Sequence, residues 1–257
     1  MKTKLGISNL SDVGKVRKAN EDYFGAYTCA NGNLIIVCDG MGGYKGGAIA
    51  SHIAVDTIKA HFDNLTGKIF EVGELKNALI KAGLAIKNKA KEDKELSEMG
   101  STVVVLFIKE GQAFTAHIGD SRIYMVRGKK IHKLTKDHSL VQQLVDAGII
   151  TAEAAKEHPQ KNIITRSLGA DASGEPEVAQ PFQTFKNDKY ILCSDGLTGC
   201  LEDDEILQIV NVNPIQDACR ILIDTANERG GKDNITVQIV EVKNGKTFPE
   251  NRLLKKM

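Results

Sequence analysis

The chain has 257 residues, of which 42% are hydrophobic and 26% charged, a composition typical of a folded globular protein. Its 34 basic and 33 acidic residues nearly cancel, so the basic excess expected of a nucleic-acid-binding protein is missing. The longest apolar runs are too short to cross a bilayer, and no apolar secretory core follows the basic N-terminus, so a cytoplasmic protein is expected in preference to a membrane-spanning or exported one.

The apolar pattern alternates between strands and helices along the chain. Short continuous runs, several of them β-branched, predict strands at 34–38, 103–108, 113–118, 122–126, 190–193 and 235–240. Apolar residues three or four apart predict helices at 48–62, 75–86, 140–145 and 215–226, the last ending before Gly230-Gly231. Gly119-Asp120-Ser121 separates two strands and predicts a tight hairpin turn.

No repeat or linker divides the chain, so the pattern predicts one α+β domain with helices packed on sheet faces. Polar residues at 148–159 and 170–177 predict a surface insertion within that domain. The apolar pattern ends at Val242, and residues 243–257 are expected to form a loose basic C-terminal tail.

Four aspartates stand at strand ends or turns beside glycine or asparagine: Asp39, Asp120, Asp195 and Asp233. Each one alone is explained as a turn residue, because Asp-Gly and Asp-Asn favour turns. An ionised carboxylate beside a buried strand is costly unless it is paired or binds a metal. Carboxylates suit hard ions such as Mg²⁺ and Mn²⁺, whereas the six histidines show no zinc-ligand spacing.

A second candidate element is the charged segment from Arg17 to Asp22. The planar arginine fork can bind a phosphate group at two points. On spacing alone, a surface salt bridge with Glu21 or Asp22 explains the same residues.

Seven segments in this order resemble the metal-dependent Ser/Thr protein phosphatases of the type 2C (PPM) family, and above all the bacterial soluble members. They are VRKANED (16–22), VCDGMGG (37–43), HIGDSR (117–122), TKDHSLV (135–141), ITRSLG (164–169), CSDGL (193–197) and GKDNIT (231–236). The resemblance implies a four-layer α-β-β-α sandwich with two central antiparallel sheets. It implies a phosphatase domain over 1–242, with a mobile flap at about 146–165.

The resemblance also implies the ligands of two catalytic Mn or Mg ions. Asp39 would bridge both ions and Gly40 would contribute its backbone carbonyl, while Asp195 and Asp233 complete the set. Asp120 matches a ligand, with Asp195, of a third and weaker ion.

Three further roles follow from the resemblance. Arg17 matches the residue that grips the substrate phosphate. Glu21 and Asp22 match positions that organise metal-bound waters.

Two positions depart from the family pattern. Met41 stands where eukaryotic members have a histidine that acts as general acid, and a thioether cannot donate a proton. Gly199 stands where many members have Asp or Asn near the third ion, which weakens the case for that ion.

The predicted function is hydrolysis of phosphoserine and phosphothreonine in proteins by direct attack of a metal-bridging hydroxide. The five cysteines, none in a Cys-x5-Arg phosphate loop, predict no thiol nucleophile, and without a Cys-x-x-Cys pair they favour the reduced cytoplasm. The expected partners are a Ser/Thr kinase and its phosphorylated targets in bacterial signalling, with the phosphatase itself a monomer. The alternative is a catalytically silent binding module of the same fold.

Overall fold

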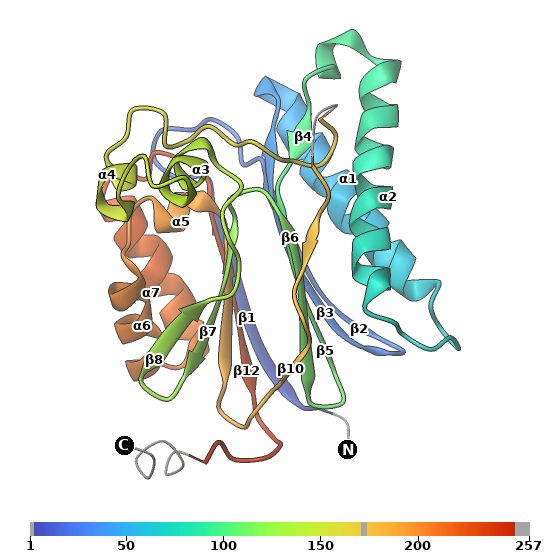
Figure 1. Ribbon diagram of the computed structural model, residues 1–257, viewed down its shortest axis with the longest axis vertical. Helices are drawn as coiled ribbons and strands as arrows, with labels where there is room; N and C mark the ends of the chain where they lie inside the picture. The colour runs from blue at the N-terminus through green and yellow to red at the C-terminus, as the bar shows by residue number, and fades with distance from the viewer. Residues whose placement is uncertain (1–2, 171–173, 250–257) are drawn as a thin grey trace.

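Two antiparallel sheets lie face to face in the computed structural model, which describes residues 3–170 and 174–249 (Figure 1). One sheet has the strand order β1-β12-β11-β7-β8, and the other has the order β10-β6-β5-β3-β2 with β4 and β9 at its side. The strands are β1 (Leu5–Asp12), β2 (Asp22–Cys29), β3 (Gly32–Met41), β4 (Gly100–Ser101), β5 (Val103–Lys109), β6 (Gln112–Ile118), β7 (Arg122–Arg127), β8 (Lys130–Lys133), β9 (Glu177–Val178), β10 (Phe182–Gln183), β11 (Lys189–Cys193) and β12 (Ile235–Val242).

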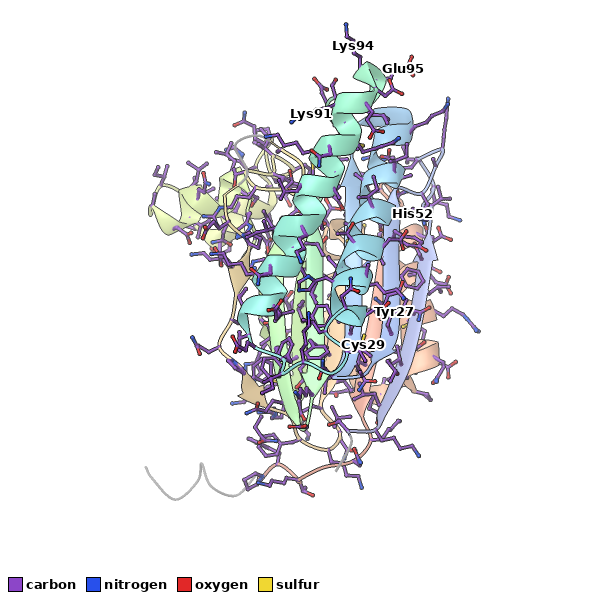
Figure 2. The ribbon with its side chains drawn as sticks, turned by 90° about the vertical axis from the view of Figure 1, so that its right-hand side faces the viewer. Tyr27, Cys29, His52, Lys91, Lys94 and Glu95 are labelled. Atoms are coloured by element: carbon purple, nitrogen blue, oxygen red, sulfur yellow. The ribbon has the colours of Figure 1, made fainter. Side chains whose placement is uncertain are left out.

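Helices cover the outer face of each sheet. α1 and α2 run side by side over the seven-stranded sheet (Figure 2), and α6 and α7 cover the five-stranded sheet (Figure 1). The helices are α1 (Gly43–Asp63), α2 (Gly73–Glu92), α3 (Leu140–Asp146), α4 (Ala152–Lys156), α5 (Asp195–Thr198), α6 (Asp203–Val212) and α7 (Ile215–Glu228), with a 3-10 turn at Lys94–Leu96. None of the helices in the described ranges is long and apolar enough to cross a membrane.

Strand β3 shows why the sequence contains continuous apolar runs. Its alternate residues Leu34, Ile36 and Cys38 pack against the core under α1 and α2. The residues between them, Ile35 and Val37, pack in the separate core between the two sheets. A third core lies between the five-stranded sheet and its helices. Because central strands bury both faces, the four-layer α-β-β-α arrangement predicted above is confirmed.

The predicted hairpin at Gly119-Asp120-Ser121 is wrong. β6 belongs to the seven-stranded sheet and β7 to the five-stranded sheet, so this segment carries the chain from one sheet to the other. Gly119 has a φ of 103°, and a Cβ there would lie 2.6 Å from Cβ of Thr102. Glycine and aspartate serve a crossover and a hairpin turn equally well, because both need the same backbone freedom.

The expectation of a loose tail after Val242 is also wrong for its first part. The Lys243 amide donates to Lys4 O at 2.9 Å, and the Lys186 amide donates to Lys246 O at 2.8 Å. The Phe248 ring packs edge-on against Phe185, with ring centroids 5.2 Å apart. The rest of the predicted tail, 250–257, lies outside the described residues.

Candidate metal centre at one end of the sandwich

The acidic residues predicted from the sequence come together at one end of the two sheets. Asp22 and Asp39 lie directly opposite each other where β2 begins and β3 ends. In the other sheet, Arg122 of β7 pairs with Cys193 of antiparallel β11. Asp120 comes two residues before Arg122 and Asp195 two residues after Cys193, so both lie just beyond the same end of these strands. Asp233 ends the loop before β12 at this end of the sandwich.

Burial and mutual repulsion raise the pKa values of these carboxyl groups. Burial, together with the negative charge of Asp195, raises the pKa of Asp22 to about 7 and that of Asp120 to about 8. The pKa of Asp39 lies well above its ordinary value because of burial and four neighbouring aspartates. Burial and the charge of Asp233 also raise the pKa of Asp195. Without a cation, the carboxyl groups at this end of the molecule therefore ionise less readily than ordinary aspartates.

Several carboxylate oxygens at this end have no hydrogen-bond partner among the described residues. They are buried and belong to Glu21 (Oε1), Asp22 (Oδ1), Asp120 (Oδ1) and Asp195 (Oδ1). A buried carboxylate with no partner costs several kcal/mol, roughly, and a bound cation removes that cost. The all-oxygen set therefore fits Mg²⁺ or Mn²⁺ rather than zinc.

A closely grouped set of potential metal ligands lies outside the acidic cluster. Among the described residues, the set of three potential ligands within 4.8 Å of one another is His117, His138 and Glu177, not the aspartates. Mg²⁺ keeps several of its waters and uses only a few protein carboxylates. Carboxylates that bind their ions together with water are consistent with that behaviour.

Two glycines let the backbone pack closely beside the aspartates. A Cβ at Gly40 would lie 2.0 Å from Gly47 O, and one at Gly196 would lie 2.0 Å from Asn234 O. No side chain fits at either position, so the glycine that follows each aspartate is required by close packing of the backbone. The Gly40 carbonyl as a metal ligand stays a prediction.

Arg17 lies at the rim of the acidic cluster, on the loop between β1 and β2. Its Nη2 donates to Asp233 Oδ2 at 2.7 Å, and its side chain is 48% exposed. The ion pair considered from the sequence therefore exists, but its partner is Asp233 rather than Glu21 or Asp22. This contact places a guanidinium group beside the acidic cluster.

Sequence reasoning missed the side chains that hold this loop and these carboxylates in place. Asn234 is buried; its Oδ1 accepts from the Glu21 amide at 2.8 Å, and its Nδ2 donates to Val13 O and Ala19 O at 2.9 Å each. Ser194 donates to Asp22 Oδ2 at 2.7 Å. Both residues directly adjoin a predicted metal ligand, and that adjacency is the signal that could have indicated them.

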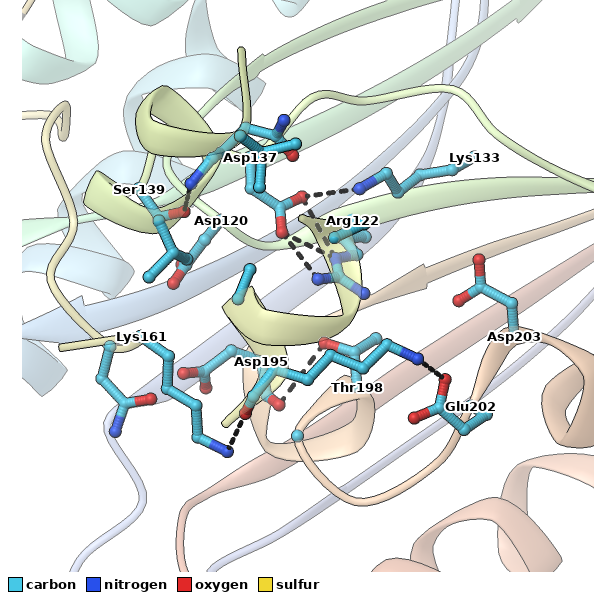
Figure 3. Close-up of a pocket in the computed structure, with 18 of the residues that line it drawn as sticks. Asp120, Arg122, Lys133, Asp137, Ser139, Lys161, Asp195, Thr198, Glu202 and Asp203 are labelled. Carbon is cyan, nitrogen blue, oxygen red and sulfur yellow. Dashed lines mark hydrogen bonds and ion pairs between the residues drawn. The ribbon is translucent and has the colours of Figure 1, made fainter. Parts of the chain in front are cut away.

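A cavity of about 600 Å³ opens beside Asp120 and Asp195, between the flap and the start of α6 (Figure 3). Arg122 lies in its wall, held by three hydrogen bonds to Asp137. The flap, predicted at about 146–165, contributes α4 to the opposite wall, where Lys156 pairs with Glu202. The cavity is therefore continuous with two of the candidate ligands.

Comparison with known proteins agrees with this geometry. The family model described as Protein phosphatase 2C matches residues 15–236. The chain is 41% identical to the protein phosphatase PhpP of Streptococcus pneumoniae over 241 residues, which cover 93% of this chain and 98% of that one. The chain belongs to the protein phosphatase 2C family. The family resemblance noted in the sequence is thereby confirmed, and the family is one of protein-serine/threonine phosphatases.

Other family members show the same extent of similarity. The serine/threonine phosphatase stp of Listeria monocytogenes is 37% identical over 238 residues, covering 90% of this chain and 93% of that one. The crystal structure of the serine/threonine phosphatase PstP/Ppp of Mycobacterium tuberculosis is similar with a TM-score of 0.84 and 33% identity, over 93% of this chain and 99% of that one. A structure of the PstP catalytic domain, with a TM-score of 0.82 and 32% identity over 93% and 99% of the chains, contains two manganese ions.

Proposed function

We propose that this protein phosphatase 2C chain hydrolyses phosphoserine and phosphothreonine in proteins by direct attack of a metal-bridging hydroxide. The observation that carries the proposal is the convergence of carboxylates from both sheets, with four buried oxygens left without a partner. Two divalent ions, Mn²⁺ or Mg²⁺, are the cofactors that such a set would hold.

The protein ligands are Asp39, Asp195 and Asp233 with the Gly40 carbonyl, and Asp120 joins Asp195 at a third, weaker ion. When bound, the paired ions supply a water of lowered pKa as the nucleophile and neutralise charge on phosphate oxygens. The two manganese ions of the PstP catalytic domain support this number of ions.

The remaining residues orient what the ions hold. Arg17 binds the substrate phosphate through its planar fork after leaving Asp233. Glu21 and Asp22 each present a buried, unpartnered oxygen, and these oxygens accept hydrogen bonds from metal-bound waters.

A cysteine nucleophile does not compete with this mechanism. All five cysteines are free thiols, and four are buried. Burial raises the pKa of the Cys38 thiol above its ordinary value and that of Cys193 to about 12, so neither forms a thiolate at neutral pH.

The proposed substrates are phosphorylated proteins of the cytoplasm, among them a Ser/Thr kinase and its targets, and the phosphatase acts as a monomer. The names of the serine/threonine phosphatases stp and PstP/Ppp support the serine/threonine class. Gel filtration of the purified chain would measure the monomer state directly.

The test compares phosphothreonine and phosphotyrosine peptides with Mn²⁺, Mg²⁺, Ca²⁺ or a chelator. We expect Mn²⁺-dependent release of phosphate, with phosphothreonine preferred. Asp39→Asn and Asp233→Asn should abolish turnover and leave the circular dichroism spectrum unchanged. Near-full activity of either variant with Mn²⁺ rejects the mechanism, and a wild type with no Mn²⁺-dependent activity favours the silent binding module.

A further inference from the structure

A pair of buried histidines lies outside the acidic cluster. His117 and His138 stack with ring centroids 4.8 Å apart, and each is about as buried as the core residues around it. Glu177 of β9 reaches the same place, so that three potential ligand atoms lie within 4.8 Å of one another. Two imidazoles and a carboxylate would suit a transition metal on composition alone.

The hydrogen bonds around His138 argue against a metal there. Its Nδ1 accepts from the Gly119 amide at 3.1 Å, so the neutral ring carries its proton on Nε2. Nε2 lies 3.1 Å from Glu177 Oε1, which accepts that proton, and 3.3 Å from Arg166 Nη1. A metal on Nε2 would move that proton to Nδ1, where it would face a second donor. In addition, the Arg166 guanidinium lies 3.0 Å from Glu177 Oε1 and would repel a cation.

His138 instead holds the backbone of Gly119 from both sides. Its ring accepts the Gly119 amide proton, and its own amide donates to Gly119 O at 2.9 Å. Gly119 is buried in the crossover between the sheets, and Thr102 lies against it too closely for any side chain. The next residue is Asp120, so the direction of the Asp120 carboxylate depends on this clamp.

The same residue fastens the base of the flap. The Thr165 amide donates to His138 O at 2.8 Å. Two residues after His138, the Leu140 amide donates to Ile163 O at 2.9 Å. These bonds join the segment that enters the flap to the segment that leaves it. Gly119 on one side and Thr165 on the other are therefore connected through one residue.

We propose that His138 is a positioning residue that couples the base of the flap to the Asp120 carboxylate. This inference rests on the proposed role of Asp120 as a ligand of the third ion. An ion on Asp120 then stabilises the attached flap, and the attached flap strengthens ion binding by the same factor, because linkage is reciprocal.

Two substitutions of His138 test the roles of its two ring nitrogens separately. Asparagine places an acceptor near the position of Nδ1, so His138→Asn keeps the bond to the Gly119 amide. Glutamine reaches the position of Nε2, so His138→Gln leaves that buried amide without its acceptor. His132→Gln is the matched control, because His132 is exposed on β8.

The experiment titrates Mn²⁺ into each full-length variant by calorimetry and follows proteolysis of the flap at low and high Mn²⁺. In the wild type, occupancy of the weak site should slow cleavage in the flap. His138→Gln should weaken the weak site by roughly 10-fold to 100-fold, as loss of an outer-shell partner does elsewhere, and should abolish the protection. His138→Asn and His132→Gln should retain both.

The outcomes separate this inference from the proposed function. If Asp120→Asn leaves weak-site binding unchanged, the assignment of Asp120 as a ligand fails, and the inference fails with it. If Asp120→Asn removes the weak site while His138→Gln binds Mn²⁺ as the wild type does, the inference alone is overturned. Equal losses in His138→Asn and His138→Gln would also overturn it, because they would indicate a general packing defect.

Discussion

Arg17 is the residue for which two explanations predict different measurements. A surface salt bridge to Asp233, exposed as this one is, contributes little to stability and nothing to substrate binding. A phosphate ligand makes charge-assisted hydrogen bonds that vanish in Arg17→Ala. The bridge alone therefore predicts unchanged kinetics.

We predict that Arg17→Ala raises KM for a phosphothreonine peptide roughly tenfold or more, with a near-wild-type melting temperature. Arg17→Lys keeps the charge but loses the planar fork and should recover only part of the loss. Steady-state kinetics with saturating Mn²⁺ measure both. An unchanged KM in Arg17→Ala would leave Arg17 as a surface ion pair.

The carboxyl cluster makes the stability of the metal-free protein depend on pH. Its folded pKa values, about 7 for Asp22 and about 8 for Asp120, exceed the ordinary value of about 3.9 for an unfolded aspartate. The folded state therefore binds more protons than the unfolded state at neutral pH, and stability falls as pH rises. Burial lowers the pKa values of His117 and His138, which gives the opposite slope only below about pH 6.5.

We predict that the chelated protein loses stability between about pH 6.5 and pH 8.5, above the range of the histidines. Urea unfolding in chelator at several pH values measures the slope, and Asp120→Asn should make it shallower. Excess Mn²⁺ should remove most of the slope, because a cation replaces the protons. A flat profile in chelator would mean that the cluster ionises freely without metal.

Among the secondary-structure elements, strands buried on both faces were predictable and their partners were not. The run at 34–38 reads as a strand because each of its residues meets an apolar layer, and β3 includes it. The same reasoning placed 113–118 and 122–126 in strands, but it joined them in a hairpin. An apolar strand fits either sheet, so only the tertiary structure shows that the chain changes sheets at Gly119.

In the candidate site, too, some residues were predictable from the sequence and others were not: the acidic candidate ligands were, and the side chains that hold them in place were not. The acidic residues could be nominated because four aspartates share positions at strand ends or turns and match the ordered motifs of the family, although each one alone resembles a turn residue. Asn234 and Ser194 were not found, because a buried amide or hydroxyl resembles any turn residue until its partners are known. The strands β1 and β2 and helix α6 were missed as well, since their apolar residues are interspersed with polar ones.

The flap is fastened at its far side by one exposed ion pair. Lys156 at the end of α4 contacts Glu202 just before α6, and both side chains are more than half exposed. We predict that Lys156→Ala accelerates protease cleavage within 149–161 and leaves the melting temperature almost unchanged, because exposed pairs contribute little to global stability.

Lys59→Ala is the matched control, since Lys59 forms an exposed pair with Asp63 on α1, away from the flap. Limited proteolysis with mass spectrometry locates the cleavage. Equal cleavage rates in the two variants would show that the Lys156 contact does not restrain the flap.

In the whole molecule, each sheet supplies part of the site, so the stacking of the sheets sets its geometry. Gln238 of β12 lies buried between the sheets and donates to Gly25 O at 3.3 Å and to Ile36 O at 2.6 Å. These bonds connect the strand that follows Asp233 to the strands that carry Asp22 and Asp39. The proposed ligand set is therefore a property of the assembled sandwich, and neither sheet alone would hold it.

The ordered start of the C-terminal tail lies at the opposite end from the site. Strand β12 has eight residues, so Val242 lies about 26 Å along the strand from the Asp233 end. There the Arg127 guanidinium lies 4.6 Å from the Phe185 ring and 5.0 Å from the Phe248 ring. These contacts pin the segment after β12 against the sheets.

We predict that Phe248→Ala lowers the melting temperature by about 1–4 °C, since a cation–π contact contributes about 0.5–1 kcal/mol. Its kcat, KM and Mn²⁺ affinity should equal those of the wild type, because changes at well-separated sites act independently. Removal of residues 243–257 should give a larger thermal shift with the same kinetics. Loss of activity at a temperature where the truncated protein is fully folded would contradict this separation and would assign the tail a part in catalysis.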